Sequence, residues 1–184
     1  MIFIRHGQSE FNVIYGQTRQ DPGIEDPPIT KLGMAQAKQA ACYLEGVNVR
    51  RLISSPYRRA LQTAAIIAKR LGLSIEVNPM VREHYAFSCD IGTPRDVLMQ
   101  EWPGIDFSQL EERWWPHEDE TNDLVAARGR AFIETTVALP DRDQIAVVSH
   151  WGFIRGVTGL KVTNGTVLRV DPKGRGVVVG TPDP

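Results

Sequence analysis

Short apolar runs alternate along this chain with longer segments whose apolar positions recur at helical spacing. Short runs rich in Ile, Val and Leu are typical of buried parallel strands, and segments with one apolar face are typical of helices packed on a sheet. The pattern predicts strands at residues 1–4, 51–54, 73–77 and 145–149, and a closing hairpin of residues 166–170 and 177–179. It predicts helices at residues 31–44, 56–71 and 123–138, and a short helix from about residue 152.

Local signals mark where these helices begin and end. Thr30 is expected to cap the first helix, and Ser55 the second, with Pro56 at its first helical position. Gly72 is placed to end that second helix, and residues 16–28, rich in Gly, Pro and Asp, are expected to form a loop. Alternating strands and helices imply right-handed crossovers, so the predicted fold is α/β, a three-layer α/β/α sandwich with a mostly parallel central sheet.

The regular pattern breaks down between residues 84 and 122. A short helix is expected from Thr93 and Pro94 to about Trp102, and three of the four tryptophans fall in this stretch. With 184 residues, of which 42% are hydrophobic, the chain can bury one core, whereas two domains would be cramped. We therefore expect a single domain over residues 1–184, with an irregular lid or insertion at about 84–122 that forms a substrate wall.

Bulk composition bounds the partners and the compartment. A net charge of -1 disfavours nucleic acid as a partner, and the apolar runs are too short to cross a membrane. The two cysteines, Cys42 and Cys89, are expected to be free thiols in a reducing cytoplasm, and Met1 already lies in the first expected strand, so no signal peptide is expected. The oligomeric state cannot be read from this composition.

Five residues with charged or titratable side chains follow the ends of the predicted strands. They are Arg5, His6, Arg59, Glu83 and His150. Ligands of open α/β sheets collect outside the carboxyl ends of the strands, so the fold would gather these residues at one edge. Two arginines and two histidines beside one carboxylate suit phosphoryl transfer through a histidine.

Each residue type fits one step of such a transfer. A neutral imidazole such as His6 is a competent nucleophile near pH 7, and Arg5 and Arg59 can pair with phosphate oxygens in a bidentate manner, with His150 as a further donor. Glu83 is the best-placed carboxylate to protonate the leaving alcohol and then to activate water. The four histidines show no paired-ligand spacing, so no metal is expected.

Five segments, in order, resemble the histidine phosphatase superfamily, which includes cofactor-dependent phosphoglycerate mutases and many small phosphatases. They are residues 5–12, which begin Arg5-His6-Gly7, and residues 29–37, 54–64, 81–84 and 147–152. The resemblance implies a phosphoglycerate mutase-like fold, with His6 phosphorylated and Glu83 as proton donor. It makes Arg5, Arg59 and His150 the phosphate pocket, with Asn12 as a neighbour, and implies neither metal nor other cofactor.

Departures from the family pattern bear on the substrate. Trp151 stands where a glycine is common, so we expect its ring to shape the mouth of the pocket. Arg82, His84 and Arg95 are candidates for binding a second anionic group of the substrate. Trp114 and Trp115 are expected to pack within the insertion, and the acidic residues 111–120 to form a solvated face.

These observations lead to a metal-independent phosphatase that hydrolyses small phosphomonoesters through a phosphohistidine. A phosphoglycerate mutase-type phosphotransferase is the alternative, and a catalytically silent phosphate-binding module is a third hypothesis. The chain is shorter than typical glycolytic mutases and has no matching C-terminal tail, which favours the phosphatase. The partner is expected to be a small phosphorylated metabolite whose identity the sequence leaves open.

Overall fold

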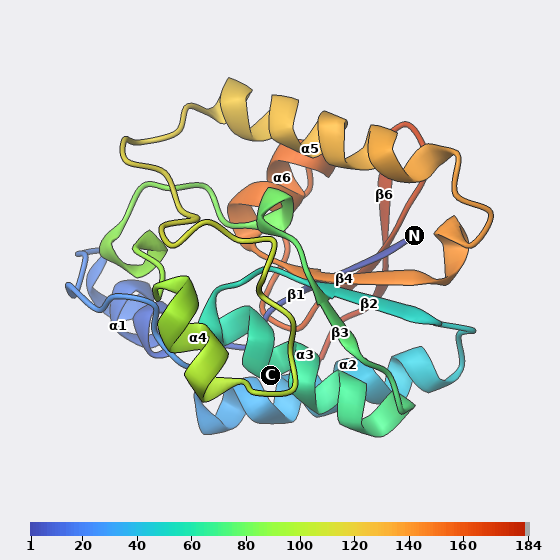
Figure 1. The fold of residues 1–184 in the computed structure, drawn as a ribbon, viewed down its shortest axis with the longest axis horizontal. Coiled ribbons are helices and arrows are strands. Elements are labelled where there is room, and N and C mark those ends of the chain that lie inside the picture. The colour runs from blue at the N-terminus through green and yellow to red at the C-terminus, as the bar shows by residue number, and fades with distance from the viewer. Residues whose placement is uncertain (183–184) are drawn as a thin grey trace.

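A six-stranded sheet forms the centre of residues 1–182, the part of the chain that the computed structural model describes (Figure 1). Its strands are β1 (Ile2–Arg5), β2 (Arg51–Ser54), β3 (Ile75–Val77), β4 (Ile145–Ser149), β5 (Val167–Val170) and β6 (Gly176–Gly180). They are ordered β3-β2-β4-β1-β5-β6. The first four strands in this order pair in parallel, and β5 and β6 add an antiparallel hairpin, so the predicted mostly parallel sheet is confirmed.

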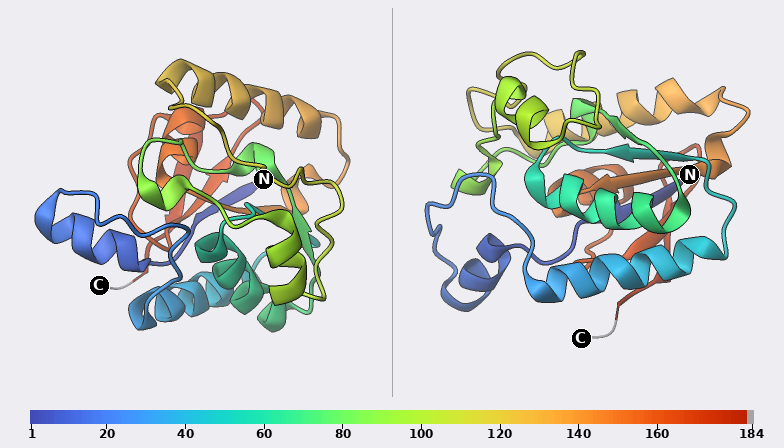
Figure 2. Two further views of the ribbon diagram at one scale, coloured as in Figure 1. Left: turned by 60° about the vertical axis from the view of Figure 1, so that its left-hand side comes forward. Right: turned by 60° about the horizontal axis from the view of Figure 1, so that its bottom comes forward.

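Helices cover both faces of this sheet. They are α1 (Glu10–Thr18), α2 (Lys31–Glu45), α3 (Arg58–Leu71), α4 (Arg95–Glu101), α5 (Asn122–Val137) and α6 (Trp151–Thr158), with 3₁₀ turns η1 (Pro79–Val81), η2 (Ser88–Asp90) and η3 (Arg142–Gln144). Helices α2 and α3 lie on one face, and α5 and α6 on the other (Figure 2). The three-layer sandwich is therefore confirmed. None of the helices in residues 1–182 is long and apolar enough to cross a membrane.

Strand β1 is apolar up to its last residue because both of its faces are buried. Ile2 and Ile4 pack into the cluster beneath α2 and α3, whereas Phe3 points to the opposite layer. There its ring lies 6.3 Å from that of Phe132 on α5 and 6.1 Å from that of Phe153 on α6. A strand buried on both faces has no position for a polar side chain until it ends, and β1 ends at Arg5.

One predicted helix start is wrong. Helix α3 begins at Arg58 and not at Pro56, because Ser55 continues the strand pairing by donating its N–H to the carbonyl of Val148. The predicted end is confirmed, since Gly72 adopts φ +67° in the left-handed region directly after α3. Thr30 caps α2 as predicted, accepting from the N–H of Gly33.

Helix α1 was not predicted. It is short and buries only Phe11, so its apolar periodicity is weak. Its start does carry a local signal, because Ser9 and Asn12 form a capping box in which each side chain accepts from the other residue's N–H. The predicted loop is confirmed only after this helix, which ends at Thr18.

Residues 84–122 pack on α3 through an apolar cluster of their own. This cluster joins Tyr57 and Leu61 to Leu98, Phe107 and Trp114. The Trp114 ring contacts Tyr57 at 4.6 Å between centroids, and its indole N–H donates to the carbonyl of Thr93. The expected short helix is present as α4, and the expected packing role of Trp114 is confirmed.

Candidate active site

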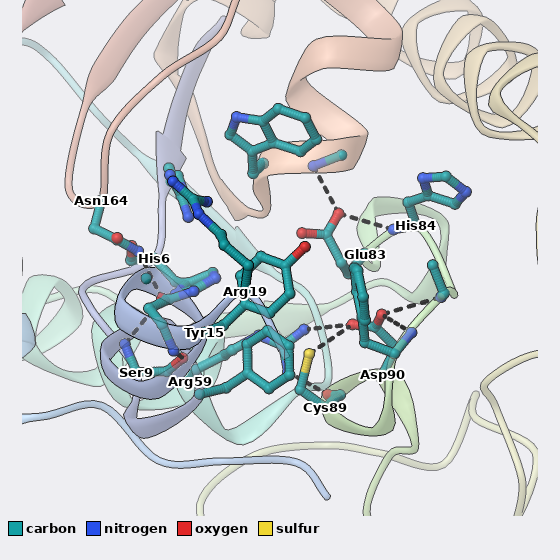
Figure 3. A pocket seen from close by; sticks show the side chains of 18 residues that line it. His6, Ser9, Tyr15, Arg19, Arg59, Glu83, His84, Cys89, Asp90 and Asn164 are labelled. Carbon is teal, nitrogen blue, oxygen red and sulfur yellow. Dashed lines mark hydrogen bonds and ion pairs between the residues drawn. The ribbon is translucent and has the colours of Figure 1, made fainter. Parts of the chain in front are cut away.

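A cavity of about 480 Å³ opens at the carboxyl end of β1, between α1, the start of α6 and residues 83–90 (Figure 3). Seven of the nine residues predicted for the site line it: Arg5, His6, Asn12, Arg59, Glu83, His84 and Trp151. His150 lies directly behind, with its ring 5.0 Å from that of His6. Arg82 does not line the cavity. The sheet thus brings together residues from distant stretches of the chain.

His6 is fixed in one orientation at the floor of the cavity. Its side chain is only 2% exposed, and its Nδ1 lies 2.7 Å from the carbonyl oxygen of Gly7. A carbonyl oxygen can only accept, so Nδ1 carries the ring hydrogen and Nε2 keeps a free lone pair. Burial, together with the positive charges of Arg59 and Arg5, holds the pKa of His6 well below its usual value. The imidazole is therefore neutral at pH 7.

Two buried guanidinium groups flank His6. Arg5 donates to the carbonyl of Val162 at 2.7 Å, and burial lowers its pKa to about 10, so it stays charged at neutral pH. Arg59 donates to the carbonyl of Cys89 and pairs with the Asp90 carboxylate at 3.0 Å. Burial alone would lower the pKa of Arg59, but nearby negative groups, Asp90 among them, raise it overall. These arginines form a permanently cationic surface beside the neutral imidazole of His6.

Asp90 holds Arg59 from behind and was not predicted. One carboxylate oxygen pairs with Arg59, and the other accepts the N–H groups of Ala86 and Phe87, at 3.1 Å each. Burial raises the pKa of Asp90 to about 6, against the opposing effect of Arg59. The signal in the sequence was weak, because Asp90 follows no strand and lies within the irregular stretch.

His150 is fully buried at the start of α6. Its Nε2 lies 2.8 Å from the hydroxyl of Ser55, and its buried Nδ1 has no hydrogen-bond partner within residues 1–182. Burial, with Arg59 and His6 nearby, keeps the pKa of His150 well below the usual value. Ser55 therefore contacts this ring rather than capping α3. A buried nitrogen without a partner calls for an explanation, and a bound ligand is one.

Glu83 presents a single carboxylate oxygen to the cavity. Its Oε1 accepts three backbone N–H groups, from His84 at 2.8 Å, Gly152 at 2.8 Å and Phe153 at 3.2 Å. The other oxygen faces the cavity (Figure 3). A side chain at position 152 would not fit, since an added Cβ would lie 2.5 Å from Oε1. The first turn of α6 thus aims Glu83.

Arg128 on α5 holds the same segment from the other side, and sequence reasoning missed it. Its guanidinium donates to the carbonyls of Met80, Arg82 and Glu83 and pairs with Glu120 at 2.9 Å. Glu120 in turn pairs with Arg82 at 2.7 Å. The prediction of a solvated acidic face is therefore wrong for Glu120, whose side chain is 8% exposed.

The two arginines predicted for a second anionic group already have carboxylate partners. Arg82 is neutralised by Glu120 and lies outside the cavity. Arg95 pairs with Asp96 and lies 3.5 Å from Glu112. His84 does line the cavity, but its Nε2 is hydrogen-bonded to the carbonyl of Glu120 at 2.6 Å. The ion pair between Arg82 and Glu120 spans 38 residues, so it left no local pattern in the sequence.

Asn12 lies at the rim of the cationic cradle that Arg5 and Arg59 form around His6. The side-chain carbonyl oxygen of Asn12 holds it in place. That oxygen accepts the N–H of Ser9 at 3.0 Å and an amide hydrogen of Asn164 at 3.0 Å, which leaves the Asn12 NH₂ group free to bind an anion. Asn164 also donates to the carbonyl of His6 and lines the cavity. It was missed because it sits in the irregular segment before β5.

Aromatic side chains form the outer wall. The rings of Phe11 and Tyr15 stack at 5.3 Å, and Phe87 packs against both, with its centroid 5.7 Å and 5.1 Å from theirs. Trp151 lines the cavity as expected, with Arg155 over its ring. In residues 1–182 no cluster of His, Cys, Asp and Glu side chains is grouped so as to hold a metal ion.

The chain is similar to known phosphatases and mutases. The family model described as histidine phosphatase superfamily (branch 1) matches residues 1–171. Glucosyl-3-phosphoglycerate phosphatase of Mycobacterium tuberculosis is 31% identical, over 86% of this chain and 73% of the relative. The 2,3-bisphosphoglycerate-dependent phosphoglycerate mutase of Thermoplasma acidophilum is 28% identical, over 92% and 86% respectively.

A solved structure has the same fold. The mycobacterial glucosyl-3-phosphoglycerate phosphatase in complex with VO3 superposes with a TM-score of 0.65 and 25% sequence identity, covering 97% of this chain and 96% of that one. A phosphoserine phosphatase of Entamoeba histolytica in complex with 3-phosphoglyceric acid matches at a TM-score of 0.59 and 20% identity, over 97% and 94%, which bears on the fold alone.

Proposed function

The chain belongs to the histidine phosphatase superfamily (branch 1), and on that premise we propose that it hydrolyses small phosphomonoesters through a phosphohistidine formed on His6. That it is a phosphomonoester hydrolase of this type follows from the family and from its phosphatase relatives. The observation that carries the proposed mechanism is the tautomer of His6. Its Nδ1–H is tied to Gly7, which leaves a neutral, unprotonated Nε2 in a cationic cradle.

In the first step, Nε2 of His6 attacks phosphorus and the ester P–O bond breaks. The leaving alcohol oxygen takes a proton from the cavity-facing oxygen of Glu83. Because Oε1 is held by three N–H groups, the proton to be given is carried by the other oxygen. Charge on the transferred phosphoryl group is stabilised by Arg5 and Arg59, with the free NH₂ group of Asn12 beside them.

In the second step, Glu83 takes a proton from water, the water oxygen attacks phosphorus, and the P–N bond breaks. Inorganic phosphate leaves and His6 returns to its neutral form. We assign to His150 the donation of a hydrogen bond to a phosphate oxygen through its unpartnered Nδ1. Tyr57 N–H points at the Ser55 hydroxyl oxygen, so that hydroxyl can donate to Nε2 of His150, which leaves the ring hydrogen on Nδ1.

The substrate proposed is a small phosphorylated metabolite. A cavity of about 480 Å³ holds a phosphate with a modest alcohol portion, and the Mycobacterium tuberculosis relative is named for glucosyl-3-phosphoglycerate. We propose a single domain over residues 1–184, in which residues 84–122 form one wall of the cavity. We also propose a cytoplasmic location, which is supported by two free cysteines, Cys42 and Cys89.

A mutase activity is the second candidate, because relatives named as phosphoglycerate mutases match as well. Incubation with 3-phosphoglycerate and a trace of 2,3-bisphosphoglycerate, followed by ³¹P NMR, separates the two. A phosphatase releases inorganic phosphate from 3-phosphoglycerate or from other members of a phosphorylated-metabolite panel. Formation of 2-phosphoglycerate without inorganic phosphate would establish the mutase instead.

A further inference from the structure

The outer half of the cavity is aromatic, and its cations are few. Beyond His6 and the two arginines of the cradle, the aromatic part of the wall consists of Phe11, Tyr15, Phe87 and Trp151, and the polar residues Arg19, His84 and Asn164 also line the cavity. The carboxylates that line the cavity, Glu83 and Asp90, both have backbone N–H partners. The wall is therefore suited to an uncharged, apolar group attached to the phosphate.

Two of the cations that a second anionic group could use are engaged elsewhere. Arg82 is paired with Glu120, and Arg95 with Asp96. Arg19 lines the mouth of the cavity with its guanidinium 5.9 Å from the centre of the Tyr15 ring, which leaves one cation in a largely apolar wall. Outside the phosphate cradle, Arg19 is the one arginine among residues 1–182 that lines the cavity, so it could compensate a single further anionic group and no more.

Hydrogen bonds between two segments that are distant in sequence hold the aromatic wall in place. Asp21, in the loop after α1, accepts the N–H of Ser88 at 2.8 Å and its hydroxyl at 2.5 Å. Asp90 accepts the N–H of Phe87 from the other side. These bonds hold Phe87 against Tyr15 at the cavity, where its side chain remains 40% exposed and so offers apolar surface to a ligand.

We propose that the substrates are phosphomonoesters whose alcohol portion carries a planar apolar ring, which packs against Tyr15 and Phe87. This inference rests on the proposed function and names the substrate class for the same site. Ring packing is offset or edge-on, as it already is between Tyr15 and Phe87, whose planes meet at 60°. The ring would replace water over the apolar surface that these two side chains expose.

The test compares 3-phenylpropyl phosphate with propyl phosphate. Both leave as a primary alcohol, so their chemistry is matched and the ratio of kcat/KM reports the ring alone. We expect a ratio of about tenfold or more in favour of the ring. Tyr15→Ala and Phe87→Ala should each reduce this ratio several-fold, Tyr15→Phe should preserve it, and thermal melts confirm that each variant is folded.

Ile14→Ala is the matched control, because Ile14 neighbours Tyr15 on α1, is exposed and does not line the cavity. This substitution should leave kcat/KM unchanged for both substrates. A ratio near one in the unmodified protein, or a ratio unchanged in both Tyr15→Ala and Phe87→Ala, would overturn the inference. So would a higher kcat/KM for 3-phosphoglycerate than for 3-phenylpropyl phosphate. Turnover without ring preference leaves the proposed function intact, whereas no phosphate release from any of these esters or from an aryl phosphate overturns both.

Discussion

The inner and outer halves of the cavity are built by different means. In the inner half, His6 and Arg5 follow from the end of β1, and the polar atoms of His6, Arg59 and Glu83 are tied to backbone groups. In the outer half, α1 and residues 84–90 meet mainly through aromatic rings, one of which stays substantially exposed. In the proposed account, the sheet positions the groups that carry out the chemistry, and segments that the sheet does not constrain select the substrate.

Removing the proposed nucleophile should give the largest loss of turnover. The loss should come from the chemical step and not from the stability of the fold. We expect His6→Ala to lose at least about 10⁴-fold in turnover, because the covalent route has no other nucleophile. Phosphate release from an aryl phosphate measures it. His117→Ala, an exposed histidine outside the cavity, is the control and should retain full activity. Unchanged turnover in His6→Ala would refute the assignment.

Glu83→Gln tests whether the inner half distinguishes leaving groups. Glutamine keeps a carbonyl oxygen for the three N–H donors, so the segment should stay in place while the proton is lost. For alkyl phosphates kcat/KM should fall about 10²–10⁴-fold, and far less for aryl phosphates with good leaving groups. Equal losses for both classes of ester would argue against Glu83 as the acid.

Arg128→Ala tests whether the inner half depends on a residue that never touches the cavity. Loss of three carbonyl contacts and of the Glu120 pair should let Glu83 drift, lowering kcat/KM for alkyl phosphates by about 10–100-fold and sparing aryl phosphates more. Arg130→Ala, exposed on the same helix, is the control. If alkyl and aryl phosphates lose equally, Arg128 acts on overall stability and not through Glu83.

Asp90 contacts both halves of the cavity. Its titration should make the free energy of unfolding depend on pH. Its folded pKa is raised from 3.8 to about 6, so its contribution to stability is full below pH 3.8 and is lost as the pH rises through about 6. Asp90→Asn removes the titration, so the stability advantage of the unmodified protein over this variant should shrink between pH 4 and 7.

Chemical unfolding of both proteins at several pH values measures this change. The two stability curves running parallel over the whole range would contradict the raised pKa. Ala86 and Phe87 keep an acceptor in the asparagine variant, so the outer wall should survive the change.

The difference between the inner and outer halves also explains which site residues could be predicted from the sequence. Strand ends are visible because a buried apolar run stops at a polar residue, so the apolar pattern alone places Arg5, His6 and His150 at one edge of the sheet. It does not place Arg128 and Asp90, because their partners are distant in sequence and no period marks them. The errors over Arg82 and Glu120 share this cause, since the two form one ion pair across 38 residues.

Helix α1 was missed for a related reason. It buries little, so its apolar pattern is faint, and only the Ser9–Asn12 capping box signalled its start. The same faintness hides the outer wall, because Tyr15 belongs to that helix and Phe87 to an irregular turn. The selectivity that we propose therefore depends on side chains whose contact no local pattern in the sequence predicts.

Identification of the phosphorylated atom tests the central claim most directly. The Glu83→Gln variant is mixed with an aryl phosphate, which needs little help to leave, and quenched in alkali, where phosphohistidine survives. Digestion and mass spectrometry then locate the phosphoryl group, and we predict it on His6 in an acid-labile linkage. A phosphoryl group trapped on any other residue would contradict the proposed mechanism.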